Sequence, residues 1–217
     1  IFNSRTTERV VVGLLESSKP SVIGFPPTDR FGEVISEQEI IERAKKEEFR
    51  ILFLGNVIHR KGLHTLLEAV ESLRSKVSVD VAGSLSSEPS YARSMQEKVK
   101  VSSLQSQVIF HGALDNDPLT EKLKQAHILV VPSSYEGFGI VYLEGMCFGL
   151  PAIGTSAGAA REIISDGDDG FLTEPENADQ LANRLKVLNE RRDVLVQMSL
   201  AARNRYLRQP RWEETAE

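Results

Sequence analysis

Short apolar runs alternate with amphipathic stretches from Arg50 towards the end of the chain. Continuous apolar runs are typical of buried strands, whereas apolar positions at helical spacing are typical of helices that cover a sheet. Their alternation predicts repeated βα units, and therefore an α/β fold with a Rossmann-like, doubly wound parallel sheet covered by helices on both faces. The predicted strands are 50–54, 77–82, 108–111, 128–131, 152–153 and 170–172. The predicted helices are 63–73, 91–101, 118–125, 140–148, 159–164, 178–188 and 193–207.

The first 49 residues follow a different pattern. Residues 1–3 predict the end of a strand, 6–17 a helix and 21–25 a second short strand, and Pro26-Pro27 predicts a turn. The charged stretch 36–48 has helical spacing and leads into the first strand of the sheet. This part of the chain is therefore expected to lie outside the repeated βα units.

Composition narrows the class of protein. A chain of 217 residues can bury a full hydrophobic core, and its 26 basic and 31 acidic residues give a net charge of -5. Because no basic cluster is present, we expect no nucleic-acid partner, and no apolar run is long enough for a membrane span. The single cysteine, Cys147, lies in an apolar helical stretch and is predicted to be buried. A chain without a disulfide or a signal-peptide pattern fits a cytoplasmic location.

The segment from Glu136 to Glu144 carries the strongest chemical signal. It follows a predicted strand, contains Gly137 and Gly139 for a tight turn, and leads into a helix that begins at Ile140. The first amides of a helix carry partial positive charge and bind anions. The two carboxylates are separated by roughly 12 Å on a helical path, so they can accept hydrogen bonds from hydroxyl groups at both ends of a nucleoside diphosphate sugar. Two glutamates at this spacing alone are typical of a solvated helix face, and the glycines between them favour the ligand site.

Two other loops are candidates because ligands of doubly wound sheets bind beyond the carboxyl ends of the strands. The loop after the first strand contains Lys61 directly before a helix, where it can offer a positive charge to a diphosphate. The loop after the third strand begins with Gly112, where the backbone can approach a nucleotide base. For the Lys61 loop, the alternative interpretation is a capped turn with solvated basic residues. For the Gly112 loop, it is a plain turn.

These motifs resemble a known family. Glu-Gly-Phe-Gly, four further residues and Glu, followed by Gly149-Leu150-Pro151, resembles the C-terminal, donor-binding domain of the retaining glycosyltransferases of family four (group 1), which have a GT-B fold. The resemblance runs from the hinge at 22–31 to Trp212. It implies that Glu144 holds the ribose hydroxyls and that Glu136 holds hydroxyls of the transferred sugar.

Further roles follow from the same resemblance. It implies that the amides of Phe138 and Gly139 meet the diphosphate and that Lys61 binds phosphate. The family commonly has an arginine after the first glycine of the Lys61 loop, where this chain has Asn56, and Arg60 is the candidate replacement. The catalytic candidates are Lys61 and Glu136. The candidate donor-binding residues are Gly55, Asn56, Arg60, Lys61, Gly112, Ala113, Leu114, Glu136, Gly137, Phe138, Gly139, Ile140 and Glu144.

The resemblance also implies an activity. The chain would bind a nucleoside-diphosphate sugar for transfer to an acceptor hydroxyl with retention of configuration, without a metal or another cofactor, and would be inactive without the N-terminal domain of the same protein. Asp166-Gly167-Asp168 is interpreted as a turn and not as a metal site. The predicted parts are a remnant of the N-terminal acceptor domain (1–24), a hinge with a leading helix (25–49), the donor-binding domain (50–207) and the start of a truncated return helix (208–217).

Other functions compete with this one. A nucleotide-sugar binding module without catalysis and a sugar-nucleotide epimerase of GT-B fold remain as alternatives. A nicotinamide-dependent oxidoreductase is disfavoured, because Tyr142 occupies the third glycine position of the dinucleotide motif and the turn follows the fourth strand. A phosphorylase would need a lysine-bound pyridoxal phosphate, which no sequence pattern here supports.

Overall fold

The computed structural model describes residues 1–15, 20–27, 30–32, 34–73, 76–210 and 212–216. Within these residues, parallel strands form one sheet in the order β3-β2-β1-β4-β5-β6. The strands are β1 (Phe49–Leu54), β2 (Val77–Ala82), β3 (Val108–Gly112), β4 (Ile128–Val130), β5 (Ala152–Thr155) and β6 (Gly170–Thr173). Each predicted strand of the main domain is present, with ends that differ by two residues or fewer. The order reverses between β1 and β4, where doubly wound sheets bind ligands.

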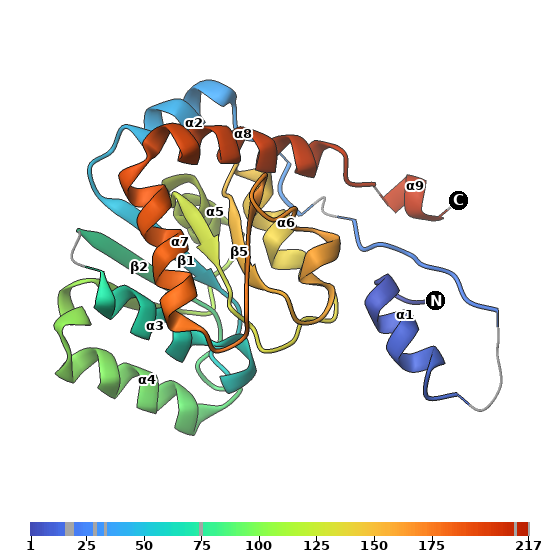
Figure 1. Ribbon diagram of the computed structural model, residues 1–217, viewed down its shortest axis with the longest axis horizontal. Helices are drawn as coiled ribbons and strands as arrows, with labels where there is room; N and C mark the ends of the chain where they lie inside the picture. Colours follow the sequence, from blue (N-terminus) through green and yellow to red (C-terminus); the bar gives the residue numbers. More distant parts are fainter. Residues whose placement is uncertain (16–19, 28–29, 33, 74–75, 211, 217) are drawn as a thin grey trace.

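Helices cover both faces of this sheet, as the sequence predicted. In Figure 1, α3 and α4 lie below the sheet and α2 with α8 lies above it. The helices that cover the sheet are α2 (Glu37–Ala44), α3 (Leu63–Ser72), α4 (Pro89–Val101), α5 (Asn116–Gln125), α6 (Ile140–Cys147), α7 (Ala178–Glu190) and α8 (Arg192–Leu207). None of the helices within the described residues is long and apolar enough to cross a membrane.

Short 3-10 turns occur between these elements. They are η1 (His59–Lys61), η2 (Ser103–Ser106) and η3 (Ala159–Glu162). The predicted α-helix over 159–164 was wrong, because only η3 forms there. The carboxylate Oδ1 of Asp169 accepts the amide of Ser165 at 2.8 Å, so this amide is not available to continue a helix.

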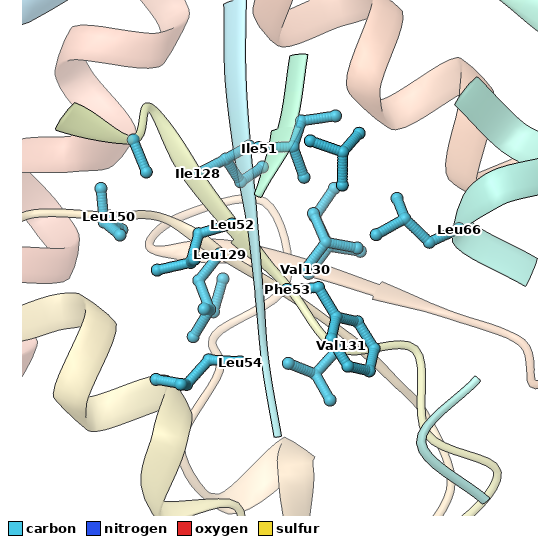
Figure 2. Packing of buried hydrophobic residues seen from close by; sticks show 14 of the residues in the cluster. Ile51, Leu52, Phe53, Leu54, Leu66, Ile128, Leu129, Val130, Val131 and Leu150 are labelled. Atoms are coloured by element: carbon cyan, nitrogen blue, oxygen red, sulfur yellow. The ribbon is translucent and has the colours of Figure 1, made fainter. Parts of the chain in front are cut away.

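The core explains the apolar runs. Figure 2 shows Leu52 and Leu54 on one side of β1, and Ile51 and Phe53 on the other side, towards Leu66 of α3. Alternate side chains of a strand face opposite sides, and both faces are covered here, so the strand is apolar at nearly every position. Cys147 is also fully buried, as predicted, and burial raises the pKa of its thiol.

The two ends of the described chain lie together, away from the sheet. Figure 1 shows α1 (Arg5–Val12) and α9 (Trp212–Ala216) on the same side of the molecule. The predicted strands 1–3 and 21–25 are reduced to one bridge between Phe2 and Ile23, because Pro26-Pro27 directly after this segment has no amide donors to extend a ladder. The predicted helix 6–17 ends at Val12, and its residues 16 and 17 lie outside the described part. The division into four parts stays a prediction.

Candidate functional site

The loops at the carboxyl edge of the sheet are joined to one another by backbone hydrogen bonds. The Gly55 amide donates to Ala82 at 2.9 Å, and the Gly83 amide donates to Gly112 at 2.8 Å. A Cβ atom on Gly83 would lie 1.9 Å from the Gly55 carbonyl oxygen, so these loops can approach this closely only because residue 83 is glycine. The loops after β1, β2 and β3 therefore converge, and the sequence predicted a shared site for the loops after the first and third of these strands.

A cavity of about 230 Å³ opens between these loops and α6. It brings together five of the predicted site residues, namely Gly55, Asn56, Ala113, Leu114 and Glu144. The other lining residues are Arg30, Leu54, Ala82, Gly83, Ser84, Leu119 and Val141. Most of the wall is apolar or backbone, and Arg30 and Glu144 are the charged side chains among its described lining residues.

Glu144 and Arg30 form an ion pair in this cavity. Glu144 is 7% exposed, and its Oε1 lies 3.0 Å from Nη1 of Arg30. The Nε of Arg30 donates to Oδ1 of Asn116 at 3.0 Å, and the Arg30 side chain remains 40% exposed. A ligand hydroxyl group that enters the cavity would thus meet a buried carboxylate already paired with a partly exposed cation. The sequence interpretation missed Arg30, for which the only signal was its position after the Pro26-Pro27 turn.

A second carboxylate, Glu136, is paired with Lys61. The Nζ of Lys61 donates to Oε1 of Glu136, and the Ser133 hydroxyl donates to the same oxygen at 2.6 Å. The Nη1 of Arg60 lies 3.8 Å from Oε2 of Glu136 and donates to the Tyr135 carbonyl at 2.6 Å. Glu136 and Lys61 are largely buried. Two cations therefore surround one carboxylate, which leaves local positive charge for an anion.

Lys61, Arg60 and Glu136 do not line the cavity, although the sequence interpretation placed all candidates around one ligand. They adjoin it through Gly55: a Cβ atom on that glycine would lie 3.6 Å from Cε of Lys61. The Lys61 side chain thus packs against Gly55, which lines the cavity. Gly55 therefore links the two ion pairs: it lines the cavity that contains Glu144, and it packs against Lys61.

The start of α6 has an uncapped geometry. Gly139 is its N-cap with φ of 95°, and a Cβ atom there would lie 2.6 Å from the Tyr142 ring, which requires glycine. No side chain within the described residues caps this helix start, so its first amides can bind a ligand. Ile140 is 40% exposed. The Phe138 side chain is buried, and its ring centroid lies 6.4 Å from that of Phe25. Gly137 holds the N-terminal segment through its carbonyl group.

Two other polar groups have structural explanations. Asp80 of β2 contacts Nε2 of His111 in β3 at 2.5 Å and Nζ of Lys122 in α5 at 2.9 Å, so this largely buried carboxylate has partners in the structure. Asp166 accepts the Leu172 amide at 2.9 Å, as expected for a turn residue. Within the described residues, no three His, Cys, Asp or Glu side chains form a metal-binding group. A larger hollow, of about 730 Å³, lies between α2 and α8 at the opposite edge, remote from both ion pairs.

Comparison with known sequences assigns most of the chain to one family. The family described as Glycosyl transferases group 1 matches residues 34–205. An uncharacterized glycosyltransferase of Methanocaldococcus jannaschii is 33% identical over 138 residues, which are 63% of this chain and 34% of that protein. A GDP-mannose-dependent alpha-(1-6)-phosphatidylinositol monomannoside mannosyltransferase of Mycobacterium tuberculosis is 27% identical over 204 residues, 88% of this chain and 53% of that protein. The chain thus spans between about a third and half the length of these relatives.

Solved structures have the same fold. Anabaena HepE, crystallised with UDP and glucose, superimposes with a TM-score of 0.85 at 20% identity over 97% of this chain and 58% of that chain. The C-terminal domain of a group 1 glycosyl transferase from Francisella tularensis superimposes with a TM-score of 0.67 at 25% identity, over 85% of this chain and 94% of that domain. The predicted Rossmann-like fold of a GT-B half is therefore confirmed.

Proposed function

The chain belongs to the group 1 family of glycosyl transferases, and on that premise we propose that the carboxyl edge of its sheet binds a nucleoside-diphosphate sugar as the donor for sugar transfer. The observation that carries the proposal is the pair of buried carboxylates, Glu136 and Glu144, at the two ends of one glycine turn and helix start. One lies in an apolar cavity and the other lies among cations. Such an arrangement suits a ligand with a nucleoside at one end and a sugar next to a diphosphate.

The nucleoside would occupy the cavity. Its walls of Leu54, Ala113 and Leu114 suit the faces of a base, while the Glu144 carboxylate can accept hydrogen bonds from both ribose hydroxyls. HepE was crystallised with UDP, and the mycobacterial relative is named as dependent on GDP-mannose. These two nucleotides support the class of ligand and leave the base of this chain's donor open.

The diphosphate would lie between Lys61 and the start of α6. As the bond from the anomeric carbon to the phosphate oxygen breaks, the nucleoside diphosphate leaves with the electron pair, and its negative charge grows. The α6 amides and the Lys61 ammonium group stabilise that charge more than the ground state, which accelerates the reaction. Because these groups supply positive charge, the proposal needs no metal ion. Glu136 would exchange part of its contact with Lys61 for hydroxyls of the sugar.

The remaining steps involve the rest of the protein. The acceptor hydroxyl oxygen forms the new bond to the anomeric carbon, with retention of configuration, and its proton passes to the phosphate oxygen of the departing nucleoside diphosphate. We propose that the acceptor is bound mainly by an N-terminal domain and that this chain alone does not transfer sugar. A cytoplasmic reaction stays part of the proposal. A binding module without catalysis would bind the same donors, and transfer by the full-length protein separates the two.

Calorimetry tests donor binding directly. The chain is titrated with UDP, GDP and ADP, and then with UDP-glucose and GDP-mannose. At least one should bind, and Glu144→Gln should weaken its binding by about 1 to 3 kcal/mol, since a charged hydrogen bond is lost. Glu97→Gln, on the exposed face of α4, should bind as the unmodified chain does. The proposal fails if none of these ligands binds, and a lower Tm with unchanged affinity would make Glu144 a structural residue.

A further inference from the structure

We propose that helix α1 orients the diphosphate-binding amide of the glycine loop (residues 136–139), so that docking of the N-terminal segment and binding of the donor strengthen each other. The inference rests on the proposed function for the identity of the ligand. The α1 contact, as we call it, consists of the hydrogen bonds from Ser4 and Thr7 to Gly137 and those from the first α1 amides to Glu162.

The first half of the α1 contact reaches the glycine loop itself. The Ser4 hydroxyl lies 2.7 Å from the Gly137 carbonyl oxygen, and the Thr7 hydroxyl lies 3.0 Å from the same oxygen. Ser4 is fully buried although it belongs to a segment 133 residues away in sequence. Ser4 is also the N-cap of α1, where its Oγ accepts the Thr7 amide at 3.0 Å. The start of α1 and the glycine loop are thus one hydrogen-bonded unit.

The second half of the α1 contact uses a carboxylate at the end of η3. Oε2 of Glu162 accepts the Arg5 amide at 2.9 Å, and Oε1 accepts the Thr6 amide at 2.7 Å. Burial acts to raise the pKa of Glu162, but these hydrogen bonds outweigh it and lower the pKa, so the carboxylate is charged at the positive end of α1. The first residue of η3, Ala159, donates its amide to the Glu136 carbonyl at 2.8 Å. Both halves therefore meet at the glycine loop.

Peptide geometry carries this contact into the ligand site. The Gly137 carbonyl and the Phe138 amide belong to one planar, trans peptide group, in which C=O and N–H point in opposite directions. When Ser4 and Thr7 hold the carbonyl oxygen, they direct the Phe138 N–H away from α1. Hydrogen bonds accepted by the carbonyl also polarise the peptide group and strengthen its N–H as a donor. Ser4 and Thr7 are therefore positioning residues for an amide that would meet the diphosphate.

The rest of α1 adds little to its docking. No residue of α1 is buried, and Val10, Val11 and Val12 are exposed. Elements with few buried apolar contacts open at low free-energy cost. The α1 contact thus dominates the equilibrium between docked and undocked helix. By linkage, a donor that favours the oriented loop must favour docked α1 by the same factor.

The first experiment compares nucleotide affinities. The Ser4→Ala/Thr7→Val double variant should bind UDP, GDP or ADP, whichever the unmodified chain binds, about fivefold more weakly. Thr7→Val alone keeps the Ser4 cap and should show a smaller loss in the same direction. Ser21→Ala is the matched control, because it removes a serine hydroxyl that bonds to Glu8 of α1 and not to the loop. Equal affinities for all four proteins would overturn the inference.

Hydrogen exchange supplies the second readout, and its first measurement, on the Phe138 amide, needs no ligand. The Phe138 amide should exchange faster in the double variant than in the unmodified chain and in Ser21→Ala, and an equal rate would overturn the inference. Added nucleotide should slow exchange of the Arg5 and Thr6 amides in the unmodified chain and not in the double variant. If the unmodified chain binds no nucleotide, the proposed function fails, and the Phe138 exchange rate still decides whether α1 orients the loop.

Discussion

The two edges of the sheet use buried ionisable side chains in different ways. At the amino edge, where the strands begin, Arg43 and His127 bond to backbone groups. At the carboxyl edge, Glu136 and Glu144 bond to the side chains of Lys61 and Arg30. A bond to a backbone carbonyl fixes the path of the chain, whereas an ion pair between side chains can exchange a partner for a ligand. Burial of an ionisable side chain alone therefore does not mark a functional site, whereas the kind of partner does.

At the amino edge, the buried side chains of Arg43 and His127 both bond to backbone groups. Arg43 donates from Nη1 to the Phe148 carbonyl and from Nη2 to the Gly149 carbonyl, both at 2.9 Å. The His127 ring accepts the Arg50 amide at Nδ1, at 3.0 Å, and therefore donates from Nε2 to the Arg43 carbonyl, at 2.9 Å. Together these bonds tie the end of α6, the end of α2 and the starts of β1 and β4. Their role is to hold the sheet and its helices in place.

The largest effect is expected for Arg43 at the amino edge, where a substitution should lower stability and leave nucleotide binding unchanged. Arg43→Ala should lower the free energy of unfolding by about 3 kcal/mol, because two buried carbonyl groups lose their donors and a cavity remains. Urea denaturation measures the loss, and Arg93→Ala, on an exposed position of α4, should leave the midpoint nearly unchanged. Nucleotide affinity measured on the folded variant should stay the same. A variant that loses affinity while keeping its stability would place Arg43 in the site.

At the carboxyl edge, Lys61→Ala should lower both the free energy of unfolding and the affinity for a nucleoside diphosphate. It should cost up to about 3 kcal/mol of stability, because Glu136 is left buried without its main partner, while Arg60 and Ser133 limit the cost. It should also weaken nucleoside diphosphate binding, since a phosphate contact is lost. The second variant, Lys61→Ala with Glu136→Gln, should regain stability and not affinity. If affinity returns together with stability, Lys61 acts through the fold and does not contact phosphate.

The sequence predicted the local features and missed the distant contacts. The strands of the sheet and the turn at Gly139 were found because their signals, apolar runs and glycines, lie within a few residues. Arg30 was missed because it meets Glu144 across 114 positions, which no local pattern records. The same holds for Ser4 and its contact with Gly137. Arg60 was proposed as a replacement cation, but only the fold shows that it is bound to the Tyr135 carbonyl.

A pH titration tests the contribution of His127 to stability at the amino edge, and its expected effect is smaller. Burial, the largest cause, lowers the pKa of His127 from 6.5 to about 3. The folded chain therefore keeps this ring neutral while the unfolded chain binds a proton, so its contribution is complete above pH 6.5 and is lost as pH falls towards 3. Stability should fall by up to about 1.4 kcal/mol per pH unit in this window. Urea midpoints between pH 7 and 5 measure it, and His127→Gln should flatten the slope.

The smallest effect is expected at Arg30, and the sign of the change in affinity decides how this residue acts on the donor. The Arg30 side chain is 40% exposed, so Arg30→Gln should change stability by less than about 1 kcal/mol. We expect nucleoside diphosphate affinity to fall by about 0.5 to 1 kcal/mol, because a cation is lost from the cavity wall, and this loss should shrink at high salt. Arg30→Lys should retain most of the affinity, and Arg93→Gln serves as the matched control. Tighter binding by Arg30→Gln would show instead that Arg30 competes with the ligand for Glu144, so that the ion pair must open before the donor can bind.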